Sequence, residues 1–193
     1  MGRQAHYHSY GMRVNPNLYE CGKVCLSPLG TWSGRGIEVW DPSTSTLLQV
    51  LVSVQGLVLV PKPYYNEAGY EKQTGSAEGE KNALVYNESA YLLVLKSMLA
   101  LLRRPPEGFA PLVCAHFRAR REHVLRACRH YLQGVRVGAL DDDAELPKPR
   151  PGGAPEAAGP SAAPEPAAEG SSEGFRLILA KLVPKLEAAF ANL

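Results

Sequence analysis

The residues best suited to chemistry lie between Asn15 and Leu26, where an Asn-Pro-Asn turn precedes a cysteine. A cysteine thiolate can attack an acyl carbon and carry the acyl group as a thioester. An amide N–H placed nearby can stabilise the oxyanion that forms when the thioester is attacked. Asn17 and Cys25 are eight residues apart and supply these two groups. We therefore interpret Cys25 as a candidate nucleophile and Asn17 as a candidate oxyanion stabiliser.

Local sequence indicates how these two side chains are held. Pro16 fixes its own φ and biases Asn15 towards extended backbone, so Asn17 extends from a stiff turn. Gly22 lets the chain reverse before the apolar residues around Cys25. Each candidate also has a simpler interpretation. Cys25 is then a buried cysteine in a strand, and Asn17 is a turn residue that binds its own backbone.

This segment resembles the active-site segment of ubiquitin-conjugating enzymes, in which a His-Pro-Asn turn precedes the catalytic cysteine at the same spacing. Within that family the resemblance is to the large hybrid conjugating enzyme/ligases, and it covers about residues 7–133. Three further segments carry it: Gly30-Thr31-Trp32-Ser33-Gly34, Leu48 to Gln55, and Pro63 to Glu71. Asn15 replaces the usual His, and Pro28 stands where an aliphatic residue is expected.

The resemblance implies a transferase that carries ubiquitin as a thioester on Cys25, with Asn17 as the oxyanion stabiliser. In this family a loop beside the cysteine often carries an acidic residue. Glu67 is therefore a candidate for orienting the incoming lysine, with Asn66 as the alternative. A solvent-exposed loop is the simpler interpretation of these two residues.

The implied partners are ubiquitin, the ubiquitin-activating enzyme of this ATP-dependent pathway, and protein substrates. The hybrid type adds ligase-like selection of its own substrates. An inactive fragment that acts as a protein-interaction scaffold is the alternative function.

Composition excludes several other classes of function. The formal charge of the 193 residues is +2, which is too small to create an electrostatic field that attracts nucleic acid or an anionic membrane. The polar N-terminus has no apolar signal core, and no apolar run is long enough to span a bilayer. We therefore expect an intracellular protein, cytoplasmic or nuclear or both, whose four cysteines are reduced.

Neither a metal nor another cofactor is expected. Cys21 lies four residues before Cys25, but this spacing matches no common structural zinc pattern, so Cys21 is expected to be an exposed thiol. A separate cluster of five arginines and three histidines occupies residues 116–130. Few aromatic residues accompany it for base stacking, so we interpret it as a solvated helix face that binds no nucleic acid.

The fold class expected from the resemblance is α+β, the C-terminal part of a ubiquitin-conjugating fold with mostly helices and a residual strand. Tyr7 to Tyr10 is the predicted strand. The apolar run 47–60 is ambiguous by periodicity, and the resemblance favours a helix capped by Asp41, Ser43 or Ser45.

Two longer helices are predicted from apolar residues that recur every three or four positions. One runs from about Glu80 to Arg104 and ends before Pro105-Pro106, and one helix or a pair spans 107–133. A last amphipathic helix is capped by Ser171 or Ser172 and kinked at Pro184.

The chain is therefore expected to contain four parts. These are a disordered start (1–6), the C-terminal portion of a ubiquitin-conjugating core (7–133), a flexible Pro/Ala/Gly/Glu-rich linker (134–172) and an amphipathic C-terminal helix (173–193). The family's opening helix and first strands would precede residue 7. The sequence is accordingly expected to be the C-terminal part of a larger protein.

Overall fold

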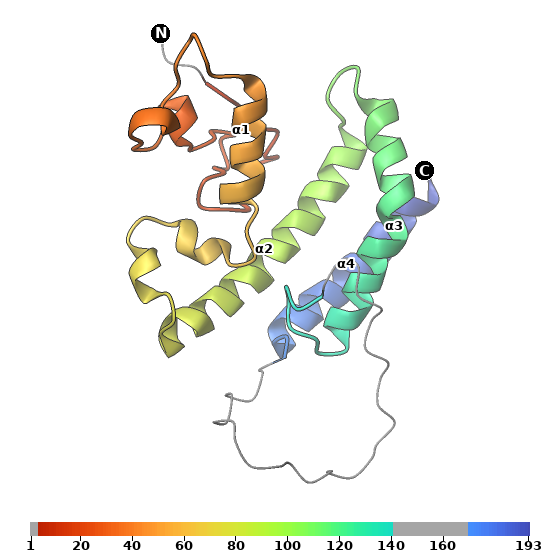
Figure 1. Ribbon diagram of the computed structural model, residues 1–193. Helices are drawn as coiled ribbons and strands as arrows, with labels where there is room; N and C mark the ends of the chain where they lie inside the picture. Colours follow the sequence, from red (N-terminus) through yellow and green to blue (C-terminus); the bar gives the residue numbers. More distant parts are fainter. Residues whose placement is uncertain (1–3, 141–169) are drawn as a thin grey trace, which may run out of the picture.

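The computed structural model describes residues 4–140 and 170–193 (Figure 1). Its long elements are helices: α1 (Leu47–Ser53), α2 (Ala77–Arg103), α3 (Ala110–Leu132) and α4 (Glu173–Ala191). Extended pairing within these described ranges is limited to three isolated bridges, between His6 and Lys23, Asn15 and Leu18, and Leu18 and Val24. None of these bridges includes Tyr7 to Tyr10, so the strand predicted at those residues was wrong, and Tyr10 lies in a turn instead.

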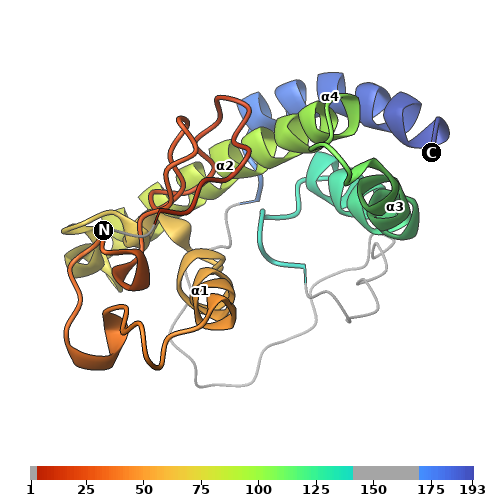
Figure 2. The ribbon, with the colours of Figure 1, turned by 90° about the horizontal axis from the view of Figure 1, so that it is seen from above.

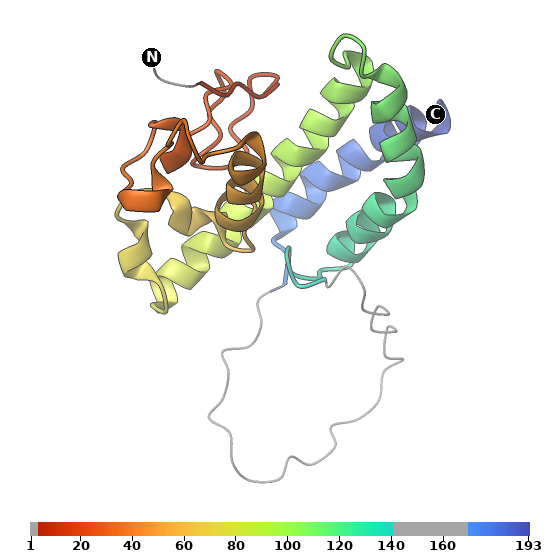
Figure 3. The ribbon, with the colours of Figure 1, turned by 45° about the horizontal axis from the view of Figure 1, so that its top comes forward.

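Helix α2 separates two regions of the molecule. Figures 1 and 3 show the segment that carries Cys25, together with α1, on one side of α2, and α3 on the other. Figure 2 shows α4 lying along α2. Each region has its own hydrophobic cluster. The smaller one joins residues 18–29 to α1 and the π-helical turn η3 (Val54–Val58) that follows it.

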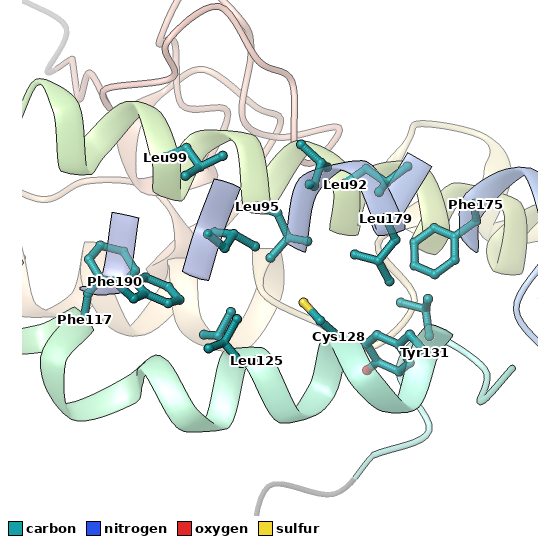
Figure 4. Packing of buried hydrophobic residues seen from close by; sticks show 14 residues of the cluster. Leu92, Leu95, Leu99, Phe117, Leu125, Cys128, Tyr131, Phe175, Leu179 and Phe190 are labelled. Carbon is teal, nitrogen blue, oxygen red and sulfur yellow. The ribbon is translucent and has the colours of Figure 1, made fainter. Parts of the chain in front are cut away.

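The larger cluster is the core of a three-helix bundle formed by α2, α3 and α4 (Figure 4). Leu92, Leu95 and Leu99 recur at three- and four-residue steps on α2, so their side chains share one face of the helix. Leu179 of α4 and Cys128 of α3 are fully buried opposite that face. The bundle therefore gives α2 a rigid support on the side away from Cys25.

Replacing Leu179 with Ala should test this core. Leu179 is 0% exposed, so the substitution should lower the free energy of unfolding by about 2–5 kcal/mol through lost burial and a cavity. Leu177 on the same helix is 60% exposed, and Leu177→Ala should change stability by less than about 0.5 kcal/mol. Urea unfolding followed by circular dichroism measures both. Equal effects of the two substitutions would show that α4 does not dock as described.

The N-terminal cap of α1 differs from the prediction. Thr46 caps the helix, with its hydroxyl accepting from Gln49 N and the Gln49 side chain accepting from Thr46 N. Asp41 instead binds the backbone N–H and the hydroxyl of Ser43, at 2.8 and 2.6 Å. The predicted caps at residues 41–45 were wrong because Asp41 closes a local turn before the helix begins.

The other helix limits lie close to those predicted. Helix α2 begins at Ala77, where the Ser76 hydroxyl accepts from Gly79 N, three residues before the expected start at Glu80. Helix α4 is capped by Ser172, one of the two predicted caps, and Pro184 lies inside it.

Most of the predicted linker, residues 141–169, lies outside the described residues, as do residues 1–3 of the predicted start. The flanks of the linker are placed. Val137 is buried in the larger cluster, and the Ser171 hydroxyl donates to Tyr131 O at 2.7 Å. The Ser172 hydroxyl lies 2.6 Å from a carboxylate oxygen of Glu88 on α2. Polar contacts therefore join the start of α4 to both other helices of the bundle.

Helix α2 corrects one expectation from composition. By length and composition it is apolar enough to cross a membrane, so the expectation that no segment reaches that length was wrong. The core helix of a bundle passes the same criterion. Leu92, Leu95 and Leu99 of α2 belong to the larger cluster, and 17% of the apolar window of α2 is buried.

Candidate functional site

Asn15 is the buried centre of the turn that precedes the candidate nucleophile. Its side chain is 4% exposed, and its Oδ1 accepts from Asn17 N at 2.9 Å. Its Nδ2 donates to Val58 O at 2.7 Å, in the π-helical turn after α1. A buried amide with both ends bonded fixes its surroundings, so Asn15 ties the turn to the end of α1.

Cys25 and Asn17 lie together in this site. The Cys25 N–H donates to Asn17 O at 2.8 Å, and Asn17 Nδ2 donates to Cys25 O at 2.9 Å. Within the described residues Asn17 Oδ1 is buried and accepts no hydrogen bond. The structure thus brings the predicted pair into direct contact, with the Asn17 amide held against the backbone of the cysteine.

Thr31 organises the other side of Cys25. The thiol of Cys25 lies 2.8 Å from Thr31 O. The Thr31 hydroxyl donates to Val24 O at 2.8 Å and accepts from Leu26 N at 2.9 Å. Sequence reasoning used Thr31 only as part of a motif and missed this role. Its signal was a threonine in the glycine-rich loop that follows the cysteine, but Ser27 and Ser33 in the same loop offered hydroxyls too.

Burial raises the pKa of the Cys25 thiol, because a buried thiolate loses hydration. The charge of Lys23 and the hydrogen bond to Thr31 lower this pKa, and the Glu67 carboxylate raises it. At neutral pH Cys25 is therefore mainly a thiol, and the reactive thiolate fraction grows as pH rises towards the raised pKa.

The alkylation rate of Cys25 should report this balance. With iodoacetamide the rate should rise about tenfold per pH unit from pH 7 and show no plateau below pH ~8.5, the pKa of an ordinary cysteine. Mass spectrometry of the Cys25 peptide measures the rate. Lys23→Gln should slow alkylation at every pH in this range, because it removes a charge that favours the thiolate. A plateau below pH 8 would contradict the burial of the thiol.

Asn66 and Glu67 occupy different positions at the edge of the site. Asn66 Nδ2 donates to Leu57 O at 3.1 Å and to Val58 O at 3.3 Å, so its amide is used within the fold. Glu67 Oε2 forms an ion pair at 3.0 Å with Arg13 Nη2, and both side chains are about 40% exposed. Of the two candidates, Glu67 is the one that carries a charge and leaves a carboxylate partly exposed.

The backbone around the cysteine accounts for two residue types in the local sequence, a proline and a glycine. Pro28 lies in the 3₁₀ helix η1 (Ser27–Leu29), in a first turn where its missing N–H is not required. Gly22 has φ of +87°, and the ring of His6 occupies the space that a Cβ at this position would need. The backbone before Cys25 therefore requires glycine at this position.

Cys21 is exposed, in contrast to Cys25. The arginines of the basic cluster are exposed on α3. Arg118 donates to Leu193 O, and Arg129 lies 3.8 Å from Glu122. These contacts lie on the opposite side of α2 from Cys25.

Comparison with curated proteins shows what the chain is similar to. It is 52% identical over 188 residues to the probable ubiquitin-conjugating enzyme E2 23 of Arabidopsis thaliana, which covers 97% of this chain and 16% of the relative. It is 50% identical over 188 residues to the probable ubiquitin-conjugating enzyme E2 24 of the same plant, with 97% and 18% covered. No family model matches the chain.

A more distant match is the human dual E2 ubiquitin-conjugating enzyme/E3 ubiquitin-protein ligase BIRC6. It is 41% identical over 133 residues, which are 68% of this chain and 3% of that protein. The chain spans only part of the two plant relatives, 16% of the length of one and 18% of the length of the other.

Sequences about 50% identical over nearly the whole chain share a fold. The chain therefore has the ubiquitin-conjugating fold expected from its sequence, in a portion where helices predominate. Its resemblance to the ubiquitin-conjugating enzymes is likewise confirmed, whereas the resemblance to the hybrid type is partial.

Proposed function

We propose, from its kinship with the ubiquitin-conjugating enzymes, that this chain accepts ubiquitin as a thioester on Cys25 and passes it to a lysine amine. The observation that carries the proposal is the pair of hydrogen bonds between Asn17 and Cys25, at 2.8 and 2.9 Å. They hold the Asn17 amide side chain against the backbone of the residue that carries the thiol, and acyl transfer through a thioester uses a thiol and a nearby N–H donor.

In this proposal the two steps use the site differently. During loading, the Cys25 thiolate attacks the activated C-terminus of ubiquitin, and the group that activated it leaves. During transfer, the substrate amine attacks the thioester carbonyl carbon, and the bond between carbon and Sγ breaks. Asn17 contributes at both steps by placing an N–H donor near the developing oxyanion.

Glu67 is the proposed group that orients the lysine. It lies in the loop between α1 and α2, and its charge reaches the Cys25 thiol, since it raises the pKa of that thiol. Asn66 then has a structural role, because its side-chain amide stabilises this loop by donating to Leu57 O and Val58 O. The acceptor lysine belongs to a protein substrate. We propose that this chain is located inside the cell, where cysteines stay reduced.

Selection of substrates by the chain's own surface is proposed as well, from the partial similarity to a dual conjugating enzyme and ligase. The feature that supports an interaction surface is the outer face of α1. Leu47, Leu48, Leu51 and Val52 are between 57% and 70% exposed there. The same face supports the alternative of an inactive interaction scaffold, because exposed apolar patches of this kind mark sites of association.

A charging assay separates the two functions. The protein, in the longest form in which it is expressed naturally, is incubated with ubiquitin-activating enzyme, ATP and ubiquitin. An adduct of one ubiquitin should form on Cys25 and should disappear on addition of a thiol reductant. Cys21→Ser is the matched control and should charge like the unmodified protein, because Cys21 is exposed and outside the site. Absence of a reducible adduct on Cys25 would refute the enzyme and leave the scaffold.

A further inference from the structure

We propose that Arg13 is a positioning residue of the transfer step, which holds Glu67 at the rim of the site and neutralises its charge while leaving one carboxylate oxygen for the substrate amine. The inference deepens the proposed function and depends on it. Arg13 and Glu67 are 54 residues apart in the sequence, so no sequence motif contains both.

The contacts of Arg13 join three parts of the site. Its Nη2 donates to Pro16 O at 3.0 Å, within the turn that carries Asn17. The same nitrogen lies 3.0 Å from Glu67 Oε2. Its guanidinium carbon lies 4.7 Å from the ring centroid of Tyr19. Arg13 thus fixes Glu67 relative to the turn, and the Tyr19 ring limits the rotation of the guanidinium.

The carboxylate of Glu67 remains half available. Only its Oε2 bonds to another described residue, and the side chain is 40% exposed. Oε1 is therefore in a position to accept a hydrogen bond from an amine that approaches the site from solvent. The ion pair selects which oxygen points to Arg13 and so which one faces the substrate.

Charge neutralisation by Arg13 matters for both reacting groups. A carboxylate without a counterion would stabilise the ammonium form of lysine, which cannot attack the thioester. It would also disfavour the Cys25 thiolate that leaves, since Glu67 already raises the pKa of that thiol. The charged groups that act on this thiol are Lys23 and Glu67. Tyr86 of α2 interacts with both Arg13 and Glu67, and burial raises the pKa of Tyr86, so it stays neutral in the pH range of the test. Arg13 therefore weakens the effect of the Glu67 charge on the lysine and on the Cys25 thiol. Oε1 of Glu67 can still accept a hydrogen bond.

The proposed transfer step joins the substrate nitrogen to ubiquitin and releases Cys25. The substrate ammonium loses one proton to solvent, and the neutral amine forms a bond to the thioester carbon. The bond from that carbon to Sγ breaks, Cys25 leaves as a thiolate, and the second proton of the new amide nitrogen passes to Glu67 or to solvent. Glu67 and Arg13 change the ease of deprotonation and are not consumed.

The test uses Arg13→Gln, Arg13→Lys, Glu67→Gln and the double variant Arg13→Gln/Glu67→Gln. Arg120→Gln serves as the matched control, since Arg120 is exposed on α3. Each protein is loaded with ubiquitin, and the discharge of the thioester to free lysine is followed in a single turnover from pH 6.5 to 9. Alkylation of unloaded Cys25 is measured over the same range and needs no activity.

Arg13→Gln should load within about threefold of the unmodified protein but discharge roughly tenfold more slowly near pH 7.5, with the rate profile shifted to higher pH. Its Cys25 should also alkylate more slowly, while Glu67→Gln should alkylate faster. In the double variant the effect of Arg13→Gln on alkylation should vanish, because the charge it offsets is absent. Arg13→Lys should keep the alkylation profile, since it retains the positive charge.

The outcomes separate this inference from the proposed function. If the unmodified protein never forms the thioester, the proposed function fails and the alkylation data alone judge the coupling of Arg13 to Glu67. If the thioester forms and Arg13→Gln discharges it with an unchanged pH profile, the inference is wrong and the enzyme stands. If Arg13→Gln slows alkylation equally with and without Glu67, Arg13 supports only the turn at Pro16, and the inference is again overturned.

Discussion

Replacing Cys25 with Ser is expected to abolish transfer of ubiquitin to lysine, by at least about 10³-fold, and to leave a ubiquitin adduct that resists thiol reductants. The serine hydroxyl ionises far less readily than a thiol, so it loads slowly. An oxyester is also a poorer acyl donor than a thioester, because the alkoxide is a worse leaving group. The readout is a gel of the charging reaction with and without reductant, followed by discharge to lysine.

The structure makes this substitution a clean test. Serine is close in size to cysteine, and its hydroxyl can donate to Thr31 O as the thiol does at 2.8 Å. The backbone bonds of Cys25 to Asn17 do not involve the side chain that changes. Cys25→Ser should therefore unfold at nearly the same urea concentration as the unmodified protein. A variant that folds and still transfers ubiquitin at the normal rate would rule out Cys25 as the nucleophile.

Much of this site was predictable because its residues are close in the sequence. Asn17 and Cys25 are eight residues apart, and the glycine and proline between and before them fix a tight turn. Helices α2, α3 and α4 were predictable for a related reason, since each repeats its apolar residues with helical spacing over many turns.

The contacts that local patterns could not predict join distant segments. Asn15 bonds to Val58 across 43 residues, and Arg13 pairs with Glu67 across 54. A sequence pattern carries no information on such pairs unless both partners belong to one periodic element. The prediction of the α1 cap was wrong for a different reason. Four neighbouring residues have side chains that can cap a helix: Asp41, Ser43, Ser45 and Thr46. Only the backbone geometry at Thr46 decided among them.

Replacing Asn17 should affect stability and catalysis differently, because the free energy of unfolding and the rate of transfer depend on different atoms of its side chain. Asn17→Ala removes one hydrogen bond to Cys25 O, which costs about 1 kcal/mol of stability. It also removes Oδ1, a buried acceptor with no bond to any described residue, whose desolvation is itself unfavourable by about 1–3 kcal/mol. The two effects offset each other, so the free energy of unfolding should change little.

The rate of transfer should nevertheless fall about 10²-fold in Asn17→Ala, since loss of one oxyanion donor costs about 3 kcal/mol in comparable sites. Asn17→Asp is the matched variant, because it keeps the shape of the side chain, removes its N–H donors and adds a charge beside Cys25 O. It should transfer at least as slowly as Asn17→Ala and be less stable. Single-turnover discharge of equal amounts of loaded protein gives the rates, and urea unfolding gives the stabilities.

The comparison of the two variants decides what Asn17 does. If Asn17 only supports the backbone of Cys25, activity should follow stability, so that Asn17→Ala discharges nearly normally and Asn17→Asp poorly. If Asn17 stabilises the oxyanion, both variants discharge slowly whatever their stability. A buried polar atom that folding leaves unsatisfied is costly, and such atoms concentrate at functional sites. Asn17 Nδ2 carries two N–H groups and donates one of them to Cys25 O, and the other is the donor that the second outcome requires.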